Sequence, residues 1–193
     1  MIGFISEKLT GYLLKRETIC QEEYEIYLFG MAQFFRKILV DATVVFLGIL
    51  FGKAWEMIIF LIAFRVIRIY AGGYHAVTPF GCYLLTILML FMVLLSLHFI
   101  SWNLSILTAV WIFASVLILA LAPIEVENRP IEEAERIYYK RKVRVFWILE
   151  NIAILLCMVL HLRMGAESIV LAQATLGMAL LCEKWIHGDV RND

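Results

Sequence analysis

The chain of 193 residues carries 17 basic and 17 acidic side chains, so it has no formal net charge, while 63% of its residues are hydrophobic. Its mean hydropathy of +0.85 excludes an ordinary soluble domain. We therefore expect an all-α, polytopic membrane protein. Because the chain has no internal repeat, low-complexity tract or Gly/Ser-rich linker, residues 1–193 are expected to form one membrane domain.

Residues 1–37 are predicted to form amphipathic helices that lie in the membrane interface. Charged residues interrupt the apolar start, so it does not read as a signal peptide. Apolar side chains recur at helical spacing on one face, and a second amphipathic stretch follows around Tyr24 to Phe35. A helix of this kind lies on the bilayer rather than across it. The apolar face is formed by Ile2, Ile5, Leu9, Tyr12 and Leu13.

Six membrane spans are predicted after this segment. Two stretches, 79–100 and 104–122, hold no charge and are long enough to cross a hydrocarbon core of about 30 Å. The other four contain or border on charged residues. Basic side chains near a span end can extend to the headgroups, which allows 54–71 to remain a span. These four predicted spans are 38–52, 54–71, 145–162 and 166–182.

The distribution of basic residues predicts the orientation. If both termini are cytoplasmic, the inner segments hold 15 of the 17 Lys and Arg residues, and the outer turns keep only Lys53 and Arg163. This asymmetry satisfies the positive-inside rule. The segment 65–78, together with the start of the following span, is thereby placed on the cytoplasmic side.

The sequence "RIYAGGYHAVTPFGC" connects the predicted spans 54–71 and 79–100. Paired glycines, Gly72 and Gly73, favour a break in the preceding helix. Thr78 followed by Pro79 is typical of a helix start, with the threonine as N-cap. Cys82 is therefore expected in the first turn of the next span.

A cysteine in this position is a candidate nucleophile. A thiol at a helix N-terminus beside a histidine ionises more readily, and His75 can serve as its base and later as an acid. The alternative is that Cys82 packs and His75 is solvated. A lone His/Cys pair lacks the further ligands that zinc requires, so no metal and no cofactor are expected.

Carboxylates at membrane depth are further candidates. Asp41 and Glu150 lie toward the cytoplasmic ends of their spans, where either can orient the imidazole of His75. The sequence does not choose between them. Cys157 and Cys182 lie in apolar runs, where a buried packing role is expected.

The segment 123–144 is predicted to be a basic cytoplasmic loop. One interpretation is topological, since such clusters keep a loop in the cytoplasm and contact anionic lipid. The other is a docking surface for an acidic peptide, and both can hold at once. The six basic residues are Arg129, Arg136, Lys140, Arg141, Lys142 and Arg144.

Taken together, these patterns suggest a family. The chain resembles the AgrB family of membrane cysteine endopeptidases in Gram-positive quorum sensing. The resemblance rests on "RIYAGGYHAVTPFGCY", an apolar span after it, and a later "APIEVENRP" before a basic segment. It implies that Cys82 is the nucleophile and His75 the general base and acid. Arg68 and Gly73 occupy motif positions with supporting roles.

The resemblance also implies a substrate and a setting. AgrB-like proteins cut the acidic tail from a propeptide, AgrD, through an acyl-enzyme that the peptide's own cysteine resolves into a cyclic thiolactone. Some members carry several lysines ahead of the proline of the second motif, whereas Arg129 is the only base here. Contact with the acidic tail is then expected from Lys140, Arg141, Lys142 and Arg144. A homodimer in the bacterial cell membrane is implied, with no nucleic acid as partner.

Two rival functions remain open. In a transporter of small molecules or peptides, Gly72 and Gly73 would break a helix at a binding site, although such sites favour the bilayer midplane. In a non-enzymatic scaffold for a sensor kinase, Cys82 would only pack. A neighbouring gene for an amphipathic peptide with a central Cys or Ser and an acidic tail would favour the peptidase.

Overall fold

The computed structural model describes residues 2–72, 79–124 and 133–187, and these ranges are almost entirely helical. No strand occurs within them, which confirms the all-α class. A short 3-10 turn, Gln21–Glu23, lies between the first two helices. The helices are α1 (Ile2–Lys15), α2 (Tyr24–Leu50), α3 (Ala54–Ala71), α4 (Pro79–Phe99), α5 (Leu104–Leu121), α6 (Glu133–Val159) and α7 (Arg163–His187).

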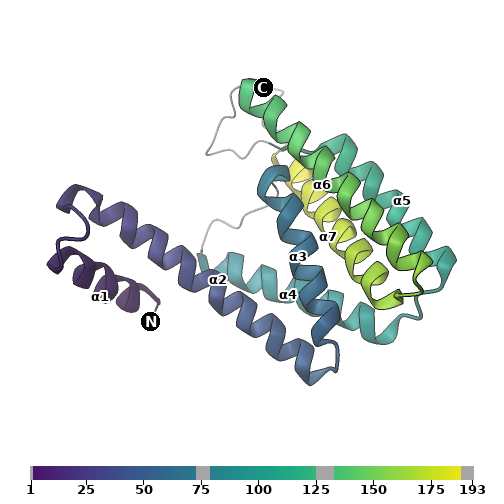
Figure 1. The fold of residues 1–193 in the computed structure, drawn as a ribbon, viewed down its shortest axis with the longest axis horizontal. Helices are drawn as coiled ribbons and strands as arrows, with labels where there is room; N and C mark the ends of the chain where they lie inside the picture. Colours follow the sequence, from purple (N-terminus) through teal and green to yellow (C-terminus); the bar gives the residue numbers. More distant parts are fainter. Residues whose placement is uncertain (1, 73–78, 125–132, 188–193) are drawn as a thin grey trace.

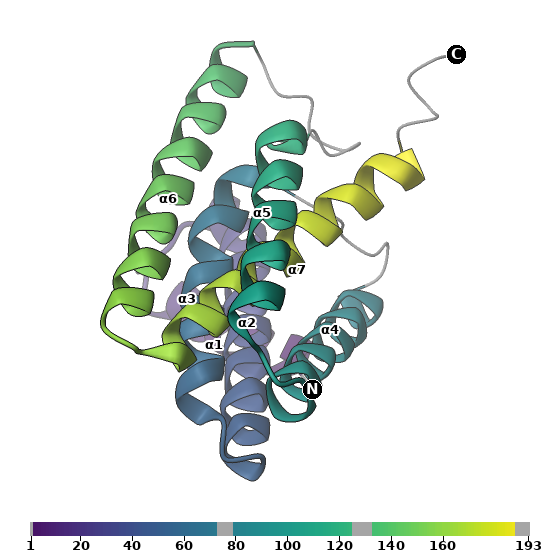
Figure 2. The same ribbon diagram turned by 90° about the vertical axis from the view of Figure 1, so that its right-hand side faces the viewer.

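Helix α7 forms the centre of a bundle. It packs against α3, α4, α5 and α6, and α4 and α6 lie on opposite sides of it (Figure 2). Its inner face is fully buried at Val170, Leu176 and Leu180. An added Cβ at Gly177 would lie 3.1 Å from the Cβ of Leu117, so α5 approaches closely because the residue is small.

The bundle has two distinct ends. At the end drawn uppermost in Figure 1, which we call the upper end, α3, α5 and α7 finish and α6 begins. At the lower end, α2 turns into α3 and α6 turns into α7. The chain therefore runs up and down between two levels, as expected for a polytopic membrane protein.

Within the described residues, three helices are long and apolar enough to cross a membrane: Phe80–Phe99, Leu104–Leu121 and Arg163–Ile186. Large apolar side chains such as Phe80 and Ile112 are exposed on them, so lipid rather than water suits their outer surface. The other predicted spans, 38–52, 54–71 and 145–162, lie in helices with more charge or an amphipathic half. The predicted count of six spans is thus not confirmed.

Two of the predicted boundaries fall inside continuous helices. Helix α2 is continuous from Tyr24 to Leu50, so the amphipathic stretch and the predicted span 38–52 form one helix. Helix α6 begins at Glu133, so the second half of the predicted loop 123–144 is helical. Charge changes how a helix is solvated but does not end it, and neither Gly nor Pro occurs within 31–47 or 133–159.

Helix α1 and the first half of α2 form an arm that projects from the bundle (Figure 1). The face of α1 toward α2 is small and polar, because Ser6 and Thr10 are fully buried. The predicted apolar face is left open to the surroundings, with exposed side chains at Ile5, Leu9 and Tyr12. This is the arrangement that a helix in the membrane interface requires.

Candidate functional site

Gly72 ends α3 at the upper end of the bundle, as the paired glycines predicted. Its φ of +76° is a conformation that other residues adopt only with strain, and an added Cβ would lie 2.7 Å from the carbonyl oxygen of Ile124. The Ile124 amide also donates a hydrogen bond to the Ala71 carbonyl at 3.1 Å. The two segments singled out in the sequence, one after α3 and one after α5, therefore meet in space.

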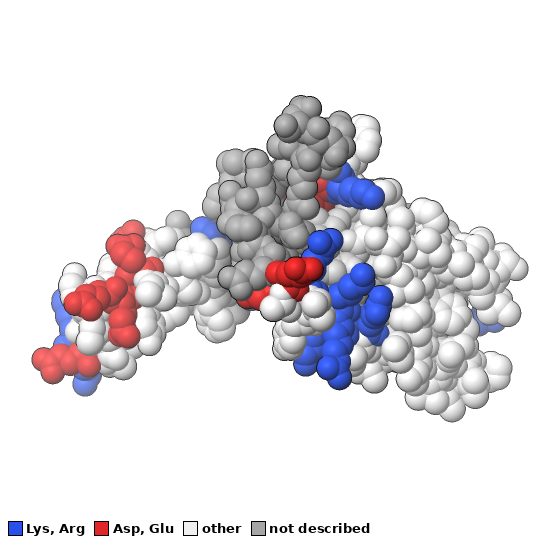
Figure 3. All heavy atoms as spheres, turned by 90° about the horizontal axis from the view of Figure 1, so that it is seen from above, with Lys and Arg blue, Asp and Glu red and all other residues white. Residues whose placement is uncertain are grey.

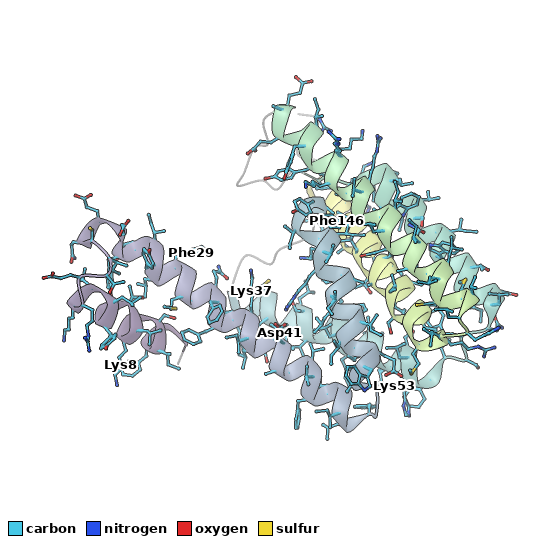
Figure 4. The ribbon with its side chains drawn as sticks, in the orientation of Figure 1. Lys8, Phe29, Lys37, Asp41, Lys53 and Phe146 are labelled. Atoms are coloured by element: carbon cyan, nitrogen blue, oxygen red, sulfur yellow. The ribbon has the colours of Figure 1, made fainter. Side chains whose placement is uncertain are left out.

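The last turn of α3 is held against α6 by aromatic packing. The rings of Tyr70 and Phe146 stack with centroids 5.4 Å apart, and Tyr139 lies beside Tyr70 at 6.3 Å. Figure 4 labels Phe146 near this end of α6. The position of the neighbouring residues on α3, Arg68 included, is thereby fixed relative to the bundle.

Cys82 is the fourth residue of α4, which begins at Pro79 as predicted. The cysteine is half-buried, and the Thr86 hydroxyl donates to its carbonyl oxygen at 2.8 Å. Its neighbour Tyr83 lies with its hydroxyl 3.2 Å from the Thr43 hydroxyl, which anchors the start of α4 to α2. The structure thus holds Cys82 in the first turn of a helix, where the free backbone amides favour negative charge.

The Arg68 side chain of α3 lies near ionisable groups on two other helices, α4 and α7. Its guanidinium carbon lies 5.3 Å from the centre of the Phe64 ring, and the group is within electrostatic range of Cys82 on α4 and Glu183 on α7. Glu183, on α7, is only 2% exposed. A basic, an acidic and a thiol side chain from three helices therefore share one region.

Three predicted site residues, Gly73, His75 and Arg129, lie outside the described residues. The pairing of His75 with Cys82 stays a prediction.

The two predicted orienting carboxylates have partners of their own. Asp41 forms a two-point ion pair with Arg65 of α3, with Arg65 Nη1 donating to Asp41 Oδ2 at 2.8 Å. Figure 4 labels Asp41 where α2 crosses the bundle, and a shallow hollow beside it is lined by Arg65 and apolar side chains. Glu150 is buried and accepts a hydrogen bond from Gln173 Nε2 at 3.1 Å. Their role toward His75 remains untested.

The basic residues of α6 do not form one cluster. Arg136, Lys140 and Arg144 are exposed and four residues apart, which places them in a row along one helix face. Lys142 is half-buried, with its ammonium 5.5 Å from the centre of the Tyr138 ring. Seen from above, basic side chains predominate on the bundle with a few acidic ones beside them, whereas the far end of the arm carries acidic side chains together with some basic ones (Figure 3).

Glu183 is the residue that sequence reasoning missed. The predicted last span ended at residue 182, but α7 continues to His187 and buries the glutamate. The available signal was a single carboxylate inside the last turns of an apolar helix. Cys182 is exposed, contrary to expectation, because the buried face runs through Leu176, Leu180 and Glu183. Cys157 packs against the core as expected.

Comparisons with known proteins place these features in a family. The family model described as accessory gene regulator B matches residues 6–182. A putative AgrB-like protein of Clostridium perfringens strain SM101 is 26% identical over 189 residues, covering 92% of this chain and 86% of the relative. A putative AgrB-like protein 2 of strain 13 is 24% identical over 143 residues, covering 70% and 67%. No solved structure gives a significant match.

Proposed function

This chain belongs to the accessory gene regulator B family, and from that premise we propose that it is a membrane cysteine endopeptidase. Membership associates the chain with the agr quorum-sensing system and with the membrane. Its proposed substrate is an AgrD-like propeptide with an acidic C-terminal tail. Cys82 attacks the peptide bond ahead of this tail and forms a thioester, and the peptide's own cysteine then displaces the enzyme to give a cyclic thiolactone.

The observation that carries this proposal is the place of Cys82 in the first turn of α4, within the electrostatic reach of Arg68. Reactive cysteines in proteins typically lie at helix N-termini or near basic groups, and the thiolate is the nucleophilic form of the side chain. Packing alone would not call for a half-buried basic group near a cysteine. In the proposed reaction His75 takes the thiol proton and gives a proton to the departing amine of the tail.

A cysteine also suits the product. A thiolactone is a reactive acyl group, and exchange between two thioesters is nearly thermoneutral, so the acyl-enzyme keeps the energy that ring closure needs. Water must be kept from the acyl-enzyme, because hydrolysis would end the reaction without a ring. The half-buried position of Cys82 between apolar helices supports such a site.

The acidic tail is proposed to bind the exposed basic residues at the start of α6. Lys140, Arg141 and Arg144 are exposed, and Arg136 extends their row, whereas Lys142 packs on Tyr138. An acidic peptide near this surface gains several weak charge contacts, each screened by salt. Arg129, which precedes Pro130, is proposed to add to them.

The proposed topology places the upper end of the bundle in the cytoplasm. The basic residues of α6 lie at this level, as do the ends of α3 and α7. Both termini of a multi-pass protein in the bacterial cell membrane are then cytoplasmic. A homodimer stays a prediction.

A transporter remains the alternative, since α3 does break at Gly72. This break lies at the end of the bundle and is closed by the Ile124 segment, which favours a turn that positions a site over a gate in a pathway.

The test is co-expression with the neighbouring propeptide, followed by mass spectrometry of the products. Cys82→Ala should abolish release of the tail while leaving membrane insertion intact, and Cys82→Ser should be nearly as inactive. Cys157→Ala and Cys182→Ala serve as matched controls and should process normally. Tail release by Cys82→Ala would refute the catalytic assignment.

A further inference from the structure

A hollow lies between α2 and α3, on residues that the proposed reaction does not use. Its volume is about 210 Å³, which is below the ~300–1,000 Å³ of pockets that enclose a small molecule. A hollow of this size suits one part of a larger molecule that lies along the surface. It is lined by an ion pair and four apolar side chains, and the lining residues are Asp41, Val45, Ile58, Leu61, Ile62 and Arg65.

The ion pair lies at the upper side of the hollow. Helix α2 descends to the lower end and α3 rises from it, so the two helices run in opposite directions (Figure 1). Figure 4 shows Asp41 above Lys53, which precedes α3 at the lower turn. Val45 lies one turn below Asp41 on α2, and Ile58 lies two turns below Arg65 on α3. The apolar wall therefore extends from the charged groups toward the lower end.

The hollow opens on the outer surface of the bundle. The opposite face of α3 is buried in the core at Phe60 and Ile67. Ile62 is 62% exposed, and the side chains of Asp41 and Arg65 are 39% and 42% exposed. Lipid surrounds the outer surface of a membrane protein, and a charged pair that faces hydrocarbon is costly without a polar partner. A lipid headgroup, but not a bare acyl chain, would stabilise this pair.

The ion pair keeps polar atoms for such a partner. Arg65 donates to Asp41 from both terminal nitrogens, Nη1 and Nη2. A guanidinium has five N–H groups and a carboxylate accepts about four hydrogen bonds, so each side chain retains capacity. Within residues 2–72, 79–124 and 133–187, neither side chain forms a further hydrogen bond. One cation beside one anion is complementary to a headgroup that also carries one charge of each sign.

We propose that this hollow binds a phospholipid with a zwitterionic headgroup that contains a primary amine, as in phosphatidylethanolamine. The phosphate accepts hydrogen bonds from Arg65, and the ammonium group donates to Asp41. One acyl chain lies against Val45, Leu61 and Ile62. A lipid of the leaflet at the upper end has this direction, because its headgroup is uppermost and its chains point toward the bilayer centre. The site is independent of the proposed peptidase reaction.

Photo-crosslinking tests the site in the full chain, reconstituted in nanodiscs of phosphatidylcholine. The probe is a phosphatidylethanolamine that carries a diazirine in one acyl chain and forms a small fraction of the lipid. Mass spectrometry of the photolysed sample identifies the cross-linked peptides. We expect the peptides with Val45 and Ile62 to carry about three to ten times more probe than the lipid-exposed peptides of α5.

Competition between lipids identifies the headgroup. Unlabelled phosphatidylethanolamine, added in place of phosphatidylcholine, should reduce cross-linking at the hollow about three- to tenfold, because the trimethylated amine of choline cannot donate a hydrogen bond. Diacylglycerol, which has no phosphate, should not reduce it. Phosphatidylglycerol, which has a phosphate but no amine, should compete more weakly than phosphatidylethanolamine.

Variants test the two halves of the hollow separately. Ile62→Trp fills the apolar part and leaves the ion pair intact, so cross-linking there should fall severalfold. Its matched control is Ile112→Trp on α5, at a side chain that is 63% exposed, and this variant should behave like the unmodified protein. Asp41→Asn should abolish the preference for phosphatidylethanolamine over phosphatidylglycerol, whereas Arg65→Gln should weaken the binding of both.

Probe spread evenly over the exposed helices would overturn the proposal, as would equal cross-linking in Ile62→Trp and the unmodified protein. Diacylglycerol or phosphatidylglycerol that competes as well as phosphatidylethanolamine would overturn the recognition of the headgroup. If the ion-pair variants do not fold, Ile62→Trp and the lipid competition decide the question by themselves.

A second copy of this chain is the alternative occupant of the hollow. In that case the probe would be excluded, and Ile62→Cys would form disulfide-linked dimers in a background without Cys20 and Cys182, which would overturn the lipid site. Cross-linking needs no substrate, so the result is separate from processing. Tail release by Cys82→Ala would refute the proposed function and leave the lipid result standing.

Discussion

The two ends of the bundle each contain a buried glutamate, yet the surroundings of the two carboxylates differ. At the lower end, Glu56 and Lys53 lie three residues apart in one turn, with Lys53 Nζ 2.9 Å from Glu56 Oε1. At the upper end, Glu183 on α7 lies within electrostatic range of Arg68 on α3. The pair at the lower end stabilises the start of a single helix. Groups that come from separate helices are instead placed relative to one another by the packing of the bundle.

The surroundings of the two ends differ in the same way. The turn at Gly52 has a φ of +65° and open space around the glycine, so only the backbone shape matters there. The turn at Gly72 has a similar φ but lies against the backbone of Ile124. The lower end joins consecutive helices, and the upper end brings together segments distant in the sequence. Because a site needs groups from several elements in fixed places, it is expected at the upper end.

The largest difference in propeptide processing between the two ends should appear when the turn glycine at each end is replaced by alanine. Gly72→Ala adds strain of about 1–2 kcal/mol and forces the Ile124 carbonyl to move, so we expect processing to fall more than tenfold. Gly52→Ala adds the strain alone and should retain most activity. Product mass spectrometry, with protein amount measured by immunoblot, checks both. Equal losses would show that the contact with Ile124 does not matter.

Thiol labelling should place the two ends on opposite sides of the membrane. Asn103 and Tyr138 are both exposed, the first at the lower end and the second on the extension of α6. In intact cells an impermeant maleimide should label Asn103→Cys at least tenfold faster than Tyr138→Cys, in a background without Cys20 and Cys182. Lysed cells should label both equally. Labelling of Tyr138→Cys from outside would reverse the proposed topology.

Neutralising the α6 row should weaken substrate binding at the upper end. Lys140→Gln combined with Arg144→Gln removes two exposed charges, each worth about 0.2–1 kcal/mol with an acidic partner, so KM should rise about two- to tenfold at unchanged kcat. Raised salt should bring the unmodified protein toward the variant. Lys37→Gln, an exposed basic residue of α2, is the control. A propeptide with a neutralised tail should respond to none of these changes.

The smallest effect should come from breaking the lower pair. Glu56→Gln leaves Lys53, whose side chain is 29% exposed, free to reach water, so stability should fall by about 1 kcal/mol or less. Processing should change less than twofold. Thermal unfolding in detergent and product analysis measure the two effects. A large loss of processing would mean that the lower end also takes part in the reaction.

Much of the fold followed from local patterns. The end of α3 at Ala71 and the start of α4 at Pro79 were predicted because glycine and proline act on the backbone where they stand. At α2 and α6, a change from charged to apolar composition falls inside one helix. A helix continues through such a change when nothing interrupts its hydrogen bonds.

The site was predicted less completely. Cys82 could be placed because its distance from Pro79 is set along the chain. Glu183 could not, since Arg68, which lies within its electrostatic range, is more than one hundred residues away along the chain, and Asp41 proved to pair with Arg65. Which carboxylate meets which basic group depends on how helices cross and on which face each turns inward.

The sequence by itself determined the all-α class, the membrane setting and the helix start that carries Cys82, because composition and backbone chemistry act within a few residues. Only the tertiary structure decided that α7 lies at the centre, that the Ile124 segment closes the turn at Gly72, and that Glu183 and Cys82 lie within electrostatic range of Arg68. The physical reason is the distance along the chain over which each interaction acts. A helix forms from hydrogen bonds between residues four apart, whereas the relative positions of charged side chains on different helices depend on how all the helices pack.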